Sequence, residues 1–162
     1  MVFEKLTQLT RYLLSQQLCA QENLDSWAES VKLELRARQQ GNGLVLCEVH
    51  YTAQFEVDRV TTNPVYWFAH IVTWLYENDP DRDVNQLDDP EIEVEPTENQ
   101  AVSISFEVEF YEPVTLVEDD NGEFELSGTR YRIDTPVMDV ADSAAIGTDD
   151  TQATDAPYTR PN

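Results

Sequence analysis

The chain is poor in lysine, and this shortage argues against several classes of partner. Only Lys5 and Lys32 are lysines, and 10 basic residues stand against 32 acidic ones, giving a formal net charge of −22. Binding to a nucleic-acid backbone depends on Lys and Arg neutralising phosphates, so a chain this acidic is poorly suited to it. An anionic membrane surface is disfavoured for the same reason.

Cysteine, glycine and long apolar runs are scarce as well. Cys19 and Cys47 are too few for a disulfide framework and lack metal-ligand spacing, so we expect buried thiols in a reducing compartment. The five glycines are scattered at turns and form no phosphate-binding loop. Because the first residues also lack a signal-peptide pattern, we expect a soluble protein that is made and used inside a cell.

The most informative stretch is residues 62–78, TNPVYWFAHIVTWLYEN, which predicts a helix with its own start and stop. Asn63 can cap the helix, Pro64 suits its first position, and Asp79-Pro80 ends it. Two rows of apolar residues recur at spacings of three and four, which predicts a broad stripe packed on a sheet. The rows are Val65, Phe68, Val72, Leu75 and Trp67, Ile71, Trp74.

Alternation of apolar and polar residues with a period of two predicts strands before and after this helix. Before this helix, the sequence predicts a helix over 2–18 with a row of Val2, Leu6, Leu9 and Leu13, and a connection over 20–30 in which Trp27 leans on the core. It then predicts a half-buried strand from 31 with Val31, Leu33, Leu35 and Ala37 on one face, a turn at 41–43 and a long strand over 44–60. After the helix, it predicts a short strand at Ile92 and Val94, a strand over 101–111, a hairpin over 114–126 that turns at Asn121-Gly122, and a last short strand at Tyr131 and Ile133.

These segments predict an α+β fold. We expect an antiparallel or mixed sheet with two helices packed on one face, in the order α-β-β-α-β-β-β-β. From Asp134 the chain is rich in Asp, Thr, Ala and Pro and nearly free of large apolar residues. Such a segment cannot bury enough surface to order itself. We therefore expect a folded domain over residues 1–136 and a flexible acidic tail over 137–162.

The sequence predicts no catalytic, metal or cofactor site. Residues 79–85, DPDRDVN, resemble the start of a calcium-binding loop, but the sixth and twelfth positions hold Val84 and Pro90 instead of Gly and Glu. A solvated acidic loop is the better interpretation. His50 and His70 are the only histidines, and no Ser or Cys lies in a recognisable nucleophile motif. We therefore expect a protein that is not an enzyme.

Two segments are candidate subunit interfaces. Arg36 and Arg38 lie on the polar face of the strand predicted from Val31. They are either solvated charges that keep an edge strand from aggregating, or a positive patch that meets the acidic surface of an identical neighbour. The predicted hairpin alternates apolar residues with acids and has more apolar surface than an isolated hairpin can hide. Its four candidate contact residues are Val114, Leu116, Phe124 and Leu126.

Three segments together resemble a known family. An N-terminal helix opens with a leucine row in residues 3–14, FEKLTQLTRYLL. A long strand runs into a helix in residues 55–80, FEVDRVTTNPVYWFAHIVTWLYENDP. An alternating strand and a hairpin follow in residues 102–122, VSISFEVEFYEPVTLVEDDNG. In this order the segments resemble the tail completion proteins of tailed bacteriophages, the protein R type of temperate contractile-tailed phages, and more broadly the tail terminators.

The resemblance implies a structural virion protein that is assembled in the host cytoplasm and forms a ring, usually a hexamer, at the head-proximal end of the tail. Such a ring stops tube polymerisation and joins the tail to the head connector. Its implied partners are copies of itself, the tail tube protein, the sheath and the connector or neck protein, while DNA passes through the lumen without specific binding and no membrane is involved. The extreme acidity and the Asp-Thr-Ala tail after Met138 depart from the family pattern. The residues alone leave a second interpretation open, a monomeric acidic adaptor or inhibitor that masks a basic partner.

Overall fold

The structure is a computed structural model that describes residues 3–41 and 43–134. The chain divides into two compact units, Met1–Leu116 and Val117–Asn162. The predicted flexible tail over 137–162 lies outside the described residues.

The first unit contains both helices and most of the sheet. Its main elements are α1 (Glu4–Ser15), β1 (Leu24–Gln40), β2 (Gly43–Val60), α2 (Pro64–Asn78), β3 (Glu91–Pro96) and β4 (Val102–Glu118). The last two residues of β4 belong to the second unit. Two short 3-10 helices, η1 (Gln21–Asn23) and η2 (Glu98–Gln100), precede β1 and β4 respectively. The strands lie in the order β1-β2-β4-β3, and the pairs β1–β2 and β3–β4 are antiparallel. The predicted α+β class and antiparallel sheet are confirmed.

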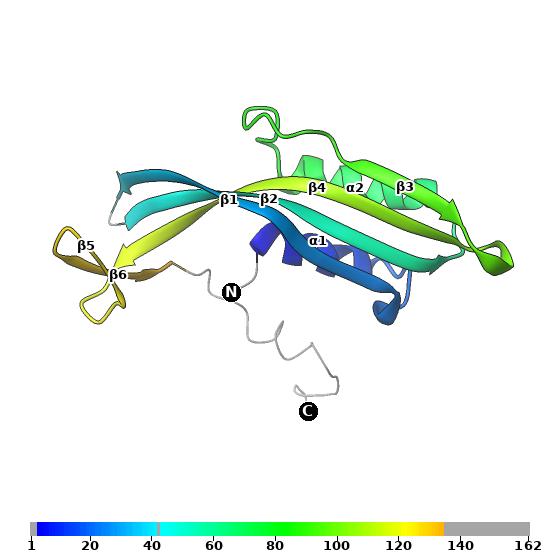
Figure 1. The fold of residues 1–162 in the computed structure, drawn as a ribbon, viewed down its shortest axis with the longest axis horizontal. Helices are drawn as coiled ribbons and strands as arrows, with labels where there is room; N and C mark the ends of the chain where they lie inside the picture. The colour runs from blue at the N-terminus through cyan, green and yellow to red at the C-terminus, as the bar shows by residue number, and fades with distance from the viewer. Residues whose placement is uncertain (1–2, 42, 135–162) are drawn as a thin grey trace, which may run out of the picture. The chain divides into compact units, whose positions relative to one another are not determined.

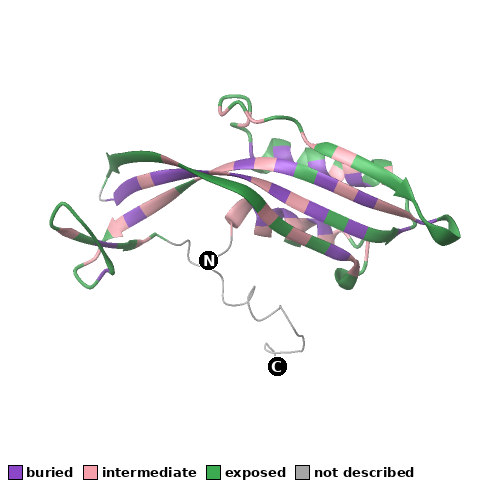
Figure 2. Ribbon diagram, in the orientation of Figure 1, coloured by how far each residue is buried: buried purple, intermediate pink, exposed green. Residues whose placement is uncertain are grey.

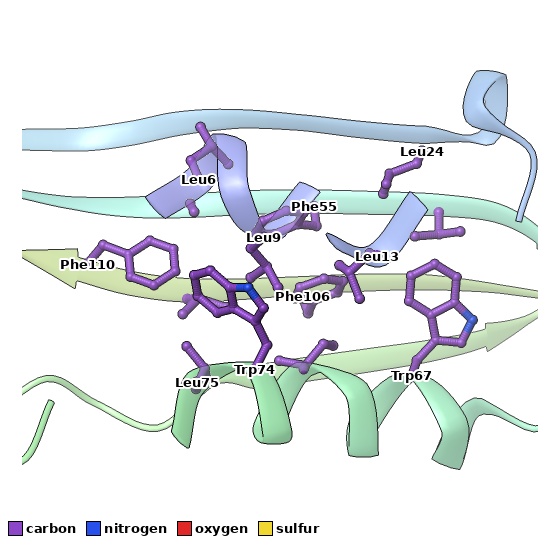
Figure 3. Close-up of a cluster of buried hydrophobic side chains, with 14 of the residues drawn as sticks. Leu6, Leu9, Leu13, Leu24, Phe55, Trp67, Trp74, Leu75, Phe106 and Phe110 are labelled. Carbon is purple, nitrogen blue, oxygen red and sulfur yellow. The ribbon is translucent and has the colours of Figure 1, made fainter. Parts of the chain in front are cut away.

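The core lies between one face of the sheet and the two helices (Figure 1). In β2 the odd-numbered residues from Val49 to Val57 are buried, and in β4 the even-numbered residues from Ile104 to Phe110 are buried, as their alternation predicts. The rings of Phe55 and Phe106 stack with their centroids 4.5 Å apart (Figure 3). The opposite face of the sheet has no helix and carries the polar side chains of both strands.

The start of α2 follows the predicted capping pattern. The Asn63 side chain accepts a hydrogen bond from the backbone N–H of Val65 at 3.0 Å, and Pro64 is the first helical residue. The row of Trp67, Ile71 and Trp74 is buried as predicted.

The second apolar row of α2 is buried only at Leu75. Val65 and Val72 are exposed and Phe68 is half-buried, so the prediction of a broad buried stripe is wrong. The reason is that α1 lies on the same face of the sheet, where its Tyr12 hydroxyl is 3.0 Å from His70 Nδ1 of α2. The two helices share the core, and α2 presents one row to it.

Helix α1 buries the predicted leucine row but is shorter than predicted. Leu6, Leu9 and Leu13 face the core. The helix ends at Ser15, and the positive φ of 59° at Gln17 prevents it from continuing to residue 18.

Strand β1 begins earlier than predicted. It starts at Leu24, so the segment predicted as a connection is mostly strand, and Trp27 is 38% exposed instead of packing in the core. Ser30 has φ 55° and, with Val31, lies opposite the single residue Tyr51 of β2. This is a β-bulge, which changes the face to which odd-numbered residues point.

After the bulge, the predicted apolar face is on the correct side of the sheet but is not buried. Leu33 pairs with Val49 and Leu35 with Cys47, so both leucines share the helix-covered face. They are nevertheless 58% and 88% exposed. This part of β1 runs beyond the ends of both helices (Figure 1), so nothing in the first unit covers it. The strand predicted from Val31 is therefore present, but the prediction that one of its faces is buried is wrong.

The predicted hairpin over 114–126 is also wrong. β4 continues through Pro113 to Glu118, and β5 (Phe124–Leu126) pairs with β6 (Thr129–Ile133). Ser127 and Gly128, both with positive φ, form the turn of that hairpin. Gly122 does lie in a turn, where its N–H donates to Asp119 O at 2.8 Å. A Cβ there would lie 2.1 Å from Tyr131 O, so only glycine fits.

Candidate functional site

Strand β1 is an exposed edge strand with apolar side chains. Among the described strands it pairs with β2 alone, so the N–H and C=O groups of its other edge have no strand partner. Figure 2 shows most of its length as exposed. Val31, Leu33 and Leu35 add apolar surface to this edge. Long exposed apolar edges invite pairing with another chain, and proteins normally shorten or cover them.

The predicted interface residues Arg36 and Arg38 lie on this edge. Arg36 Nη2 is 3.2 Å from Glu34 Oε1, and Arg38 Nη2 is 3.7 Å from Glu48 Oε1. Both arginine side chains are more than half exposed. The Arg36–Glu34 pair is exposed and contributes little to stability, so the Arg36 guanidinium remains available to a partner; Arg38 instead pairs with Glu48, which is only 8% exposed.

Glu34 fixes this part of β1 to the sheet. The Tyr111 hydroxyl of β4 donates to Glu34 Oε1 at 3.0 Å, and therefore reaches across β2 on the face without helices. Hydrogen bonds from Tyr111 and Arg36 lower the pKa of Glu34. Desolvation and the bond to Glu34 raise the pKa of Tyr111. Beside them, His50 Nε2 of β2 lies 3.8 Å from Glu109 Oε2. The edge strand is thus positioned by a polar network that also orients Arg36.

Strand β3 is an edge strand that is opposite in charge to residues 32–38 of β1. Among the described strands β3 pairs with β4 alone, and its Glu91, Glu93 and Glu95 are exposed. Val94 is 38% exposed on the other face. A cleft of about 440 Å³ lies between α2, the loop after it and β3; its apolar lining is Ile71, Val72, Leu75, Tyr76, Pro80, Pro90 and Ile92. The short strand predicted at Ile92 and Val94 was not predicted to be an acidic edge, although the alternation of EIEVE was the signal for it.

The predicted solvated loop after α2 contains a buried ion cluster instead. Asp79 is 2% exposed, with Lys5 Nζ at 2.6 Å from its Oδ1 and Arg82 Nη1 at 2.8 Å from its Oδ2. The prediction of a solvated loop is therefore wrong at Asp79. The cluster joins the start of α1 to the end of α2 and has a structural role.

The four other predicted interface residues do not form one surface. Val114 packs partly buried against the core and Leu116 is 2% exposed, both in the first unit. Phe124 and Leu126 lie on β5 of the second unit and are 36% and 38% exposed. Of the four, only the β5 pair presents exposed apolar side chains.

Within residues 3–41 and 43–134, no three His, Cys, Asp or Glu side chains are grouped in a way that could hold a metal ion. No helix in this part of the chain is long and apolar enough to cross a membrane.

Comparison with known proteins identifies the family. Residues 3–136 match the family described as P2 phage tail completion protein R (GpR). A protein of Haemophilus phage HP1 (strain HP1c1), described as an uncharacterized 19.2 kDa protein in the rep-hol intergenic region, is 37% identical over 118 residues, which cover 69% of this chain and 70% of that protein. No solved structure matches the chain. The exposed, oppositely charged edges thus belong to a phage structural protein, and the chain is a member of the P2 phage tail completion protein R family.

Proposed function

We propose that the protein is a tail terminator, a structural subunit that forms a closed homohexameric ring at the head-proximal end of a phage tail. The ring stops polymerisation of the tail tube and joins the tail to the head connector. The observation that carries this proposal is the family match over residues 3–136. The protein acts by binding its neighbours and not by catalysis.

Two features of the chain support a ring. The first unit has two strand edges without a strand partner among the described residues, and such edges are ready templates for contacts between copies. The net charge of −22 suits a lumen through which DNA passes, because like charge keeps the phosphate backbone from adhering.

We further propose that Phe124 and Leu126 of β5 contact a tail component other than the neighbouring copy, either the tube, the sheath or the connector. Both side chains are partly exposed on a short hairpin. Replacing both by serine should leave the oligomer intact and weaken its binding to purified tails in co-sedimentation.

The ring is tested by native mass spectrometry and light scattering across a salt series. Subunits of charge −22 repel one another, and salt screens this repulsion, so the hexamer fraction should rise with salt up to a few hundred millimolar. A chain that stays monomeric at every salt concentration, and that also fails to bind tail tubes, would favour the alternative of an acidic adaptor that masks a basic partner.

The terminator role is tested in the phage. Virions made without this protein should contain tails of irregular length that lack heads in electron micrographs, and the wild-type chain supplied in trans should restore them. Tails of normal length joined to heads would exclude the proposed role, whatever the oligomeric state of the purified protein.

A further inference from the structure

We propose that neighbouring copies join by strand addition, with the free edge of β1 from one copy pairing with the free edge of β3 from the next. The sheet then continues from subunit to subunit. This inference rests on the proposed ring and specifies the interface that forms it.

Charge complementarity on one face of the sheet is the first argument. Between residues 32 and 36, β1 has two basic residues, Lys32 and Arg36, and one acid, Glu34; Arg38 follows a second register shift and pairs with Val45. β3 has three acids, Glu91, Glu93 and Glu95, and no base. The β3 acids pair with Ser103, Ser105 and Glu107 of β4 on the face without helices. Glu34 of β1 reaches Tyr111 on this same face, and Lys32, two residues earlier in the strand, points the same way. A continuous sheet therefore places bases of one copy beside acids of the next.

Apolar complementarity on the other face is the second argument. Leu33 and Leu35 share the helix-covered side of the sheet but are 58% and 88% exposed in their own copy. On β3, Ile92 and Val94 pair with Phe106 and Ile104 and so point to the helix-covered side too.

The cleft between α2 and β3 opens beside Ile92. Its apolar lining gives the uncovered leucines a place to be buried once β1 is added to this edge. Both faces of the two edges therefore match when one sheet continues into the next.

The same charges exclude the symmetric alternatives. Pairing β1 with β1 brings arginines together, and pairing β3 with β3 brings glutamates together, and like charges directly opposite each other are destabilising. Only the mixed pair is attractive. A contact between two different surfaces is heterologous, and it closes into a ring when the rotation between copies divides a full turn. The edge charges thus select the kind of contact that a ring requires.

Charge reversal tests the interface with the net charge as an internal control. Arg36→Glu/Arg38→Glu changes the net charge from −22 to −26, whereas Glu93→Arg/Glu95→Arg changes it to −18. Whole subunits repel one another less in the second variant, so net charge alone would favour its assembly. The proposal instead expects both variants to raise the protein concentration needed for half-assembly by more than about tenfold, because each removes the opposite charges at the interface. Combining all four substitutions keeps −22 and restores opposite charges on the two edges, so assembly should return.

Matched controls place the same changes outside the two strands. Arg11→Glu/Arg59→Glu also gives −26, and Glu22→Arg/Asp58→Arg also gives −18. All four side chains are exposed, and none belongs to an ion pair in the described part of the chain. These variants should change the half-assembly concentration by less than about threefold. Circular dichroism and urea midpoints confirm that every variant compared is folded.

Chemical cross-linking then locates the contact. Rings are assembled from equal amounts of ordinary and ¹⁵N-labelled chains, and a carbodiimide joins amines to carboxylates that touch. Lys5 Nζ lies 2.6 Å from Asp79 of its own chain, so that link should occur only in peptides of uniform label. Links from Lys32 should join Glu91, Glu93 or Glu95 in peptides of mixed label.

The possible results separate the interface from the ring itself. If the wild-type chain forms a ring and both edge variants assemble equally well, the proposed interface is wrong and the proposed ring stands. The same conclusion follows if Lys32 links to acids outside β3 in peptides of mixed label. A wild-type chain that never assembles overturns both proposals. Loss of assembly in both edge variants, recovery in the fourfold variant and mixed Lys32–β3 links together support strand addition.

Discussion

The buried ion cluster at Asp79 gives a sharp prediction for the stability of the first unit. Asp79→Asn keeps the shape of the side chain and removes its charge. In the native protein the carboxylate is 2% exposed and receives a charge-assisted hydrogen bond on each oxygen, from Lys5 and from Arg82. The substitution leaves two cations facing each other with no anion between them.

The expected loss of stability is about 3 kcal/mol. Removing one partner of a buried ion pair generally costs about 3–5 kcal/mol, because the other charge stays buried and unpaired. The lower end applies here because each cation keeps other acceptors. Arg82 also donates to the carbonyl oxygens of Glu109 and Asp88 at 2.7 and 2.6 Å. Lys5 also donates to Tyr111 O at 3.3 Å, and its side chain is 25% exposed to water.

Urea unfolding of the monomer at low salt and low protein concentration measures this loss. With an m-value of about 1–3 kcal/mol/M, the midpoint should fall by about 1–3 M. Asp81→Asn is the matched control, an exposed acid two residues away whose change should stay within about 0.5 kcal/mol. In an Arg82→Met background the cost of Asp79→Asn should shrink by about 1 kcal/mol or more, because the two side chains interact directly. Equal midpoints for Asp79→Asn and Asp81→Asn would refute the view that the cluster stabilises the fold.

Three further predictions concern other parts of the chain. Trp74→Ala should cost about 3–5 kcal/mol in the same urea assay, because Trp74 is buried against Phe110; a midpoint like that of the parent would remove it from the core. The pKa of Glu34 should lie below its ordinary value in a ¹³C NMR titration, so the charged, hydrogen-bonded carboxylate persists as pH falls and is lost only near that lower pKa. Tyr111→Phe should raise the pKa of Glu34, and an unchanged pKa would argue against the hydrogen bond. A chain that ends at Ala141 should melt within a few degrees of the full chain, and a larger fall would show that the removed residues contribute to the fold.

The sequence predicts elements correctly where a local pattern decides burial. From Val49 to Val57, β2 lies between two neighbouring strands and alternates without interruption, so its alternation appears directly as burial. The start of α2 depends on Asn63 and Pro64, and both act on the residues beside them. Such signals need no knowledge of the rest of the fold.

The predictions fail where burial depends on distant parts of the chain. Val31, Leu33 and Leu35 have a strand pattern, but whether they are buried depends on how far α1 and α2 extend over the sheet. Pro113 looked like the end of a strand. The structure nevertheless continues β4 through Pro113 to Glu118, so the proline does not end the strand.

The buried cluster could not be predicted for the same reason. Asp79 lies in a run of acids and prolines that is typical of a solvated loop. One of its partners, Lys5, is 74 residues away in the sequence, and only the packing of α1 beside the end of α2 brings them together. The only hint in the sequence was Lys5, one of two lysines in the chain, and a lysine by itself does not identify the acid that it binds.

The bulge at Ser30 connects the fold of β1 to its proposed role. Before the bulge, Leu24, Ser26 and Ala28 face the helices, and the Ser26 hydroxyl lies 2.9 Å from that of Thr10 on α1. Without the extra residue, the same alternation would put Lys32 and Glu34 on the helix-covered side and turn Leu33 and Leu35 to the face of Tyr111. The bulge therefore lets one long strand meet α1 with Ser26 and Ala28 near its start and, further along, present leucines on one face and Lys32 and Glu34 on the other. The change of face adds little to the core of its own copy, because Leu33 and Leu35 remain 58% and 88% exposed after it. This arrangement fits the proposed pairing with another sheet edge that is apolar on one face and acidic on the other.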